Sequence, residues 1–192
     1  MIRSLTFAFL GAFALAGPVM ADTARESDLE SLWTLLAATP AYEARLTVEE
    51  EDITWTGAVH WSAKAERRSL VRDGVERIII VDRADDRLIS ILPAAQYAVD
   101  YSLQSLQAKG LLVPNPRDFA LSREWADDAG EEEIGGVQTR KFQSHANFKG
   151  RNVDAQLWVD GNGIVRRVLI YEDGTFLEPL REMRLEDVEM KA

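Results

Sequence analysis

Hydrophobic and polar positions alternate with a period of two along most of the chain, which is the pattern of β-strands with one face in water. The clearest cases are 42–48 and 54–62, and the second places Trp55, Gly57 and Trp61 on one face. Similar runs occur at 67–72, 75–81, 87–92, 96–101, 119–126, 136–146, 152–159, 164–172 and 176–188. Short turns rich in Asp, Asn and Gly separate most of these runs, as in an antiparallel meander of about ten strands.

Helical spacing is confined to two short segments. In 27–38 the leucines recur every three or four residues, and Ser27 followed by Glu30 forms a capping box, which predicts a helix that begins at Ser27. A second short helix is predicted at 102–110, before a loop with two prolines. Because a sheet of this size cannot stay flat, the pattern predicts a mainly β (α+β) fold. We expect a curved antiparallel sheet forming an incomplete β-barrel, with the two helices covering its concave face.

The first 21 residues have the pattern of a signal peptide. Arg3 precedes an apolar run over 5–16, Gly17 and Pro18 break the run, and Ala21 supplies the small residue before a cut. The run is shorter than the roughly 20 residues that a membrane-spanning helix needs. We therefore expect cleavage after Ala21, export to the periplasm, and a single soluble domain over 22–192.

Charge and cysteine content narrow the classes of partner. The formal net charge is −10, so the surface should repel phosphate backbones and anionic membranes, and we expect no nucleic-acid partner. The chain has no cysteine, which excludes disulfides and thiolate metal sites and fits a bacterial exported protein. We expect a monomer that is stabilised by packing alone.

The sequence predicts neither catalysis nor a resident metal or cofactor. It contains none of the common hydrolase, metalloprotease or nucleotide-binding motifs. His60 and His145 lie on separate predicted strands without a partner at metal-ligand spacing. The acidic run 131–133 is interpreted as a solvated hairpin end, and 160–163 as a tight hairpin turn that lacks the other ligands of a calcium loop.

Aromatic and aliphatic residues are the best candidates for binding. About ten strands present more apolar surface than two short helices can cover, and a partly uncovered apolar cleft is a natural ligand site. The candidate ligand-binding residues are Trp33, Leu46, Trp55, Val59, Trp61, Leu70, Ile78, Ile80, Ile89, Ile91, Tyr97 and Trp158. The sequence leaves open which face of each strand lines the cavity.

Several segments, taken in order, resemble the outer-membrane lipoprotein carrier (lipoprotein-sorting protein) superfamily of periplasmic chaperones. These segments are 42–46, 57–61, 68–74, 86–93, 135–142 and 156–167. The resemblance implies an incomplete barrel with a helical lid, whose concave apolar face holds a lipid or the acyl chains of a lipoprotein. It also implies a membrane-associated donor or acceptor protein as a further partner.

Two functions are therefore expected, both non-catalytic. The first is a periplasmic carrier or binding protein for a lipid or an acylated lipoprotein. The second is an envelope-stress sensor or scaffold that binds a protein partner through an exposed edge strand.

The lipoprotein chaperones carry a lid-holding arginine just after the strand that corresponds to 57–61. In this chain the matching segment, 62–65, contains no arginine. Relatives that carry other lipids therefore stay open.

Overall fold

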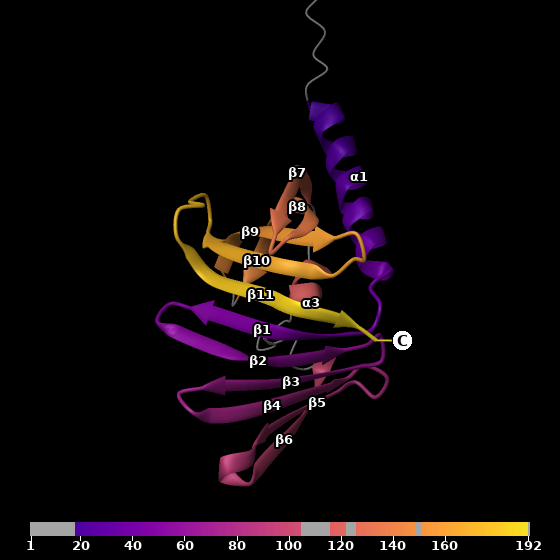
Figure 1. Cartoon of the computed structure of the whole chain (residues 1–192). Helices are drawn as coiled ribbons and strands as arrows, with labels where there is room; N and C mark the ends of the chain where they lie inside the picture. Colours follow the sequence, from indigo (N-terminus) through magenta and orange to yellow (C-terminus); the bar gives the residue numbers. More distant parts are fainter. Residues whose placement is uncertain (1–17, 105–115, 122–125, 149–150, 192) are drawn as a thin grey trace, which may run out of the picture.

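Eleven antiparallel strands form one curved, open sheet (Figure 1). The computed structural model describes residues 18–104, 116–121, 126–148 and 151–191. The strands are β1 (Tyr42–Glu50), β2 (Ile53–Trp61), β3 (Ala65–Arg72), β4 (Val75–Asp82), β5 (Arg87–Leu92), β6 (Tyr97–Ser102), β7 (Asp127–Ile134), β8 (Val137–Phe148), β9 (Arg151–Asp160), β10 (Val165–Glu172) and β11 (Pro179–Met190). Their order across the sheet is β6-β5-β4-β3-β2-β1-β11-β10-β9-β8-β7. Strands β6 and β7 are thus the two edges, and the predicted incomplete barrel is confirmed.

The helices whose bounds lie within the described residues are α1 (Pro18–Ala37), α3 (Pro116–Leu121) and the 3₁₀ turn η1 (Pro93–Ala95). Figure 1 shows α3 behind β11 and β1, on the concave side of the curled sheet. Of the helices in the described residues, none has the length and apolar character that crossing a bilayer requires. The predicted signal peptide over 1–21 lies mostly outside the described residues, and cleavage after Ala21, which falls inside α1, stays a prediction.

Three local predictions were wrong. The helix α1 begins at Pro18 and runs through Ser27, so the capping box at Ser27 does not mark its start. The predicted strand over 119–126 is occupied in part by α3, which ends at Leu121. The segment 127–130, which falls between two predicted strands as one of the predicted Asp- and Gly-rich turns, is the beginning of β7, an edge strand that is largely exposed on both faces and so shows no hydrophobic alternation. The predicted helix over 102–110 lies mainly outside the described residues.

The main core lies between α1, α3 and the concave face. Leu29, Leu32 and Leu36 of α1 are buried, and they join side chains from β1, β2, β3 and from β8 to β11. The strand register explains why these side chains share one face. Residues directly opposite each other on neighbouring strands, such as Tyr42 and Trp61, point to the same face, and so does every second residue along each strand. A smaller cluster of Ile79, Val81, Leu88 and Leu103 continues the same face towards β4 and β5.

Gly57 lies on this concave face where β2 and β3 come unusually close. A Cβ atom at this position would lie 1.8 Å from the carbonyl oxygen of Ser69 on β3. Gly57 pairs with Leu46 on one side and Leu70 on the other. The missing side chain thus permits a close backbone approach in the middle of the sheet, between Trp55 and Val59.

Candidate functional site

The concave face is divided into a filled part and a less covered part. The helices α1 and α3 pack against β7, β10 and each other. Towards the edge strand β6, Tyr97 and Tyr101 lie on the same concave side but are 56% and 40% exposed. Trp55 on β2 is half-buried on this face. This part offers apolar surface to a ligand.

The structure brings half of the twelve predicted ligand-binding residues onto this face. Those on the concave face are Leu46, Trp55, Val59, Trp61, Leu70 and Tyr97. On the opposite, outer face lie Ile78, Ile80, Ile89, Ile91 and Trp158. Trp33 is on α1 and is exposed. The structure thus divides the candidates between two faces, which the sequence had left open, and contact of any of them with a ligand stays a prediction.

The isoleucines of β4 and β5 lie on the outer face for a simple physical reason. In β4 three consecutive residues, Ile78 to Ile80, are apolar, so the sequence does not reveal which parity faces inward. The register pairs Ile79 with Arg68 and Ser90, both on the concave face, and so sends Ile78 and Ile80 outward. Trp158 is buried on the outer face with Leu169 and Tyr171.

A buried charge cluster lies on the concave face beside these apolar residues. The Glu66 carboxylate accepts a short hydrogen bond from Arg68 Nε and another from Arg83 Nη2 at 3.1 Å. The side chain of Glu66 is fully buried and that of Arg68 is 3% exposed. Burial alone raises the pKa of Glu66, but the charges and hydrogen bonds of Arg68 and Arg83 outweigh it and leave the pKa below its usual value. The carboxylate is therefore ionised at neutral pH.

Further guanidinium groups lie close to the same face. Arg77 Nε donates to Ser90 Oγ at 3.1 Å. The guanidinium of Arg72 lies 5.7 Å from the centre of the Trp55 ring, and that of Arg117 on α3 lies 4.7 Å from the Trp61 ring. The concave face thus combines aromatic surface with positive charge in a protein that is acidic overall. Arg67 and Arg68 are neighbours on β3 and point to opposite faces, as successive strand residues do, so only Arg68 contributes to the concave face.

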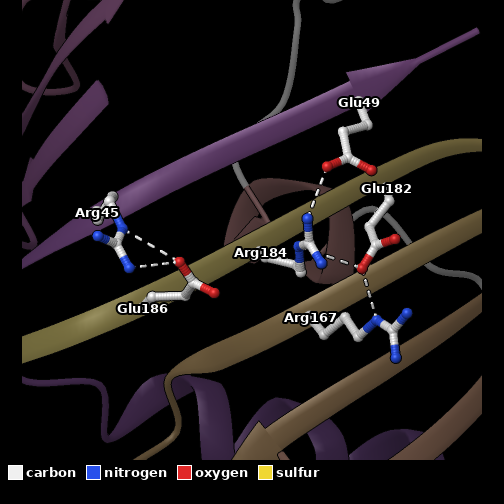
Figure 2. Close-up of polar contacts among 6 residues, drawn as sticks. All are labelled: Arg45, Glu49, Arg167, Glu182, Arg184 and Glu186. Carbon is white, nitrogen blue, oxygen red and sulfur yellow. Dashed lines mark hydrogen bonds and ion pairs between the residues drawn. The ribbon is translucent and has the colours of Figure 1, made fainter. Parts of the chain in front are cut away.

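The outer face is polar over β1, β11 and β10. Figure 2 shows a row of ion pairs there: Arg45 with Glu186, Arg184 with Glu49 and Glu182, and Arg167 with Glu182. The arginines of this row border a cavity of about 570 Å³ that also reaches β7. An ion pair that is about half exposed, such as Arg45 with Glu186, contributes little to stability, about 0–1 kcal/mol. Their arginines are engaged by carboxylates, so this cavity is a weak candidate for anion binding.

Both histidines lie on the outer face, each beside a carboxylate. His60 Nδ1 is 2.9 Å from Glu43 Oε1 across β1 and β2, and His145 Nδ1 contacts Asp154 Oδ1 across β8 and β9. Hydrogen bonds from Lys191 and then from His60 hold the pKa of Glu43 below its ordinary value. Neither pair lies on the concave face.

The turn at 160–163 has the geometry of the predicted hairpin turn. Asp160 Oδ1 accepts hydrogen bonds from the backbone N–H groups of Asn162 and Ile164, and Oδ2 accepts one from Arg166 Nε. Both carboxylate oxygens are thus used inside the protein.

A separate cavity of about 610 Å³ lies where the β1–β2 turn meets the loop before β11, and carboxylates such as Glu51, Asp52 and Glu178 line it.

The fold and the face together define an open, curved β-sheet with helices on its concave side. No family model and no curated protein matches the sequence. Among solved structures, an uncharacterised conserved protein of Thermus thermophilus has a TM-score of 0.61 at 10% identity, over 86% of this chain and 87% of that one.

Two further solved structures share the fold at lower TM-scores. The MucA/MucB complex of Pseudomonas aeruginosa matches with a TM-score of 0.56 at 15% identity, over 86% of this chain and 58% of that chain. The lipoprotein LppX of Mycobacterium tuberculosis matches with a TM-score of 0.50 at 14% identity, over 84% and 93%. The chain spans 60% of MucB solved alone. At such low identities these likenesses establish the shared fold.

Proposed function

We propose that the protein is a non-catalytic carrier or binding protein of the cell envelope, and that its concave face holds acyl chains of a lipid or a lipoprotein. The observation that carries this proposal is the exposed aromatic surface of Tyr97 and Tyr101 on the concave side of an open sheet. The leader-like start of the chain and the fold shared with the lipoprotein LppX support it. Assignment to the lipoprotein-sorting superfamily is part of the same proposal.

The energetics favour an acyl ligand. Removing apolar carbon from water contributes about 0.8 kcal/mol per methylene, or roughly 12 kcal/mol gross for a chain of about 16 carbons. Such binding needs apolar walls more than fixed polar contacts. Arg77 and Arg72, which border those walls, would favour a ligand whose polar end is anionic.

Replacing Tyr97 with glutamate should weaken palmitate binding by about tenfold or more, because a carboxylate on the apolar wall would lose its hydration when the chain binds. The matched control is Ala98→Glu, since Ala98 is the next residue of β6, is also exposed, and faces the outer side. Binding is measured through the change in tryptophan fluorescence on adding palmitate, and native mass spectrometry of the purified protein reports lipid that copurifies. Equal losses in both variants, or no binding by the unmodified protein, would contradict the proposal.

A protein partner is the second candidate function. In the described residues, β6 and β7 each pair with a single strand, so both edges of the sheet offer unpaired backbone groups. MucB, which shares the fold, was solved in complex with MucA. Affinity capture from a detergent extract of the envelope distinguishes the candidates: a stoichiometric protein partner without bound lipid favours the second, and lipid without protein favours the first.

A further inference from the structure

Three potential metal ligands meet on the outer face, away from the proposed acyl-binding surface. His145 on β8 and Asp154 on β9 are direct cross-strand partners, and Asp173 lies in the turn that follows β10. One nitrogen or oxygen atom of each lies within 4.8 Å of the others. Residues 145, 154 and 173 are far apart in the sequence, which is why spacing alone predicted no metal site here.

Asp154 is the unusual member of the cluster. Its side chain is only 1% exposed. Oδ2 accepts a hydrogen bond from the backbone N–H of Gly174 at 2.7 Å, whereas Oδ1 is buried and accepts no hydrogen bond within the described part of the structure. A buried carboxylate oxygen without a donor is costly, so its position calls for a compensating positive charge.

The direction in which Oδ1 points identifies where that charge belongs. It contacts Nδ1 of His145, and both atoms carry lone pairs when the imidazole is neutral. Two such atoms in contact require either a proton or a metal ion between them. Asp173 adds a second carboxylate beside this pair. A shared proton needs only two atoms, whereas a metal ion needs more ligands, so the third residue favours a metal ion.

We propose that His145, Asp154 and Asp173 form a binding site for a divalent first-row transition metal ion, with zinc as the best match. One imidazole and two carboxylates suit zinc, whereas calcium requires six or more oxygen ligands. In a tetrahedral zinc site the ligand atoms lie about 3.4 Å apart. His145 Nδ1 and Asp154 Oδ1, which are in direct contact, would therefore have to separate, and Asp173 would have to approach them. His145 and Asp173 are both exposed and can make these movements, and water would complete the coordination.

The fold holds the central ligand in place. The hydrogen bond from Gly174 fixes the Asp154 carboxylate and ties the turn after β10 to β9. Within that turn the N–H of Thr175 donates to the carbonyl oxygen of Glu172 at 3.1 Å. A bound ion would therefore join the β8–β9 pair to the β10–β11 connection, in a chain that has no disulfide. We expect zinc to raise the melting temperature of the protein.

The test uses the untagged protein and titration with zinc chloride. The chain has only two histidines, so NMR of the imidazole protons gives one signal set for the site and one internal control. Zinc should shift the His145 signals, leave those of His60 unchanged, and bind one ion per chain in calorimetry. His145→Gln should abolish binding, whereas His60→Gln, which alters the other histidine–carboxylate pair, should leave it intact.

Asp173→Asn is the decisive variant, because Asp173 is exposed and its replacement should not disturb folding. It should weaken zinc binding by about tenfold or more while the melting temperature without zinc stays the same. Three results would overturn the proposal: equal responses of both histidines, unchanged affinity in Asp173→Asn, or His145 signals that respond to pH but not to zinc. The last result would mean that only a proton lies between His145 and Asp154.

Discussion

Replacing Glu66 with glutamine should lower the free energy of unfolding by about 3–5 kcal/mol, the usual cost of removing one member of a buried ion pair. Arg68 would keep its charge at 3% exposure and lose its carboxylate partner, and Arg83 would lose the acceptor of its 3.1 Å contact. Glutamine keeps nearly the same shape, so the change isolates the charge. Urea unfolding at neutral pH, followed by tryptophan fluorescence, measures the effect.

The loss should depend on pH in a definite direction. The pKa of Glu66 lies below its ordinary value of 4.5 in the folded protein. Its ionised form therefore contributes stability that is fully present above about pH 4.5 and is lost as the pH falls through the lowered pKa. The difference in unfolding free energy between the unmodified protein and Glu66→Gln should thus be constant near neutrality and shrink in acid.

The control for this prediction is Glu186→Gln on the outer face. Glu186 also pairs with an arginine, Arg45, but both side chains are about half exposed. Its replacement should lower the free energy of unfolding by less than about 1 kcal/mol. If the two variants lose similar stability, the charge cluster at Glu66 is not the buried pair described above. The double variant Glu66→Leu with Arg68→Met should recover much of the loss, since the fully buried pair is removed as a whole and only Arg83, whose side chain is 24% exposed, loses an acceptor.

The sequence predicted the sheet well because alternation is a local property. Each strand with one buried and one wet face, such as β1 and β3, shows a period of two that any window of six residues reveals. The prediction failed where this contrast is missing. Strand β7 is an edge strand that is mostly exposed, so its acidic residues resemble a turn until β8 is seen to pair with it.

The candidate site was less predictable because it depends on register. The alternation within a single strand assigns Trp55, Val59 and Trp61 to one face. Matching that face to β4 and β5 requires the pairing of Arg68 with Ile79. The same holds for polar groups. Glu66 on β3 meets Arg83, which directly follows β4, and His145 meets Asp154 only across a hairpin. Contacts of this kind follow from topology and carry no local sequence signal.

The end of α1 docks onto the β9–β10 hairpin through a glycine that leaves no room for a side chain. Gly163 has φ = +75°, and a Cβ atom there would lie 1.9 Å from the carbonyl oxygen of Leu35. Next to it, Thr39 Oγ1 lies 2.8 Å from the carbonyl oxygen of Gly163 and 2.7 Å from that of Leu36. The backbone of the hairpin and the last turn of the helix are therefore in direct contact.

Gly163→Ala should destabilise the protein by about 3 kcal/mol or more, because alanine in a left-handed conformation costs about 1–2 kcal/mol and the helix end must also move. Gly161 is the matched control two residues away: it is exposed, and a Cβ atom there would meet nothing within 4 Å. Gly161→Ala should change stability by about 0.5 kcal/mol at most. Urea unfolding compares the two variants, and hydrogen exchange should show faster opening of α1 in Gly163→Ala alone. Equal stability of the two variants would mean that α1 does not rest on this hairpin, and the filled half of the concave face would then lack its helical cover.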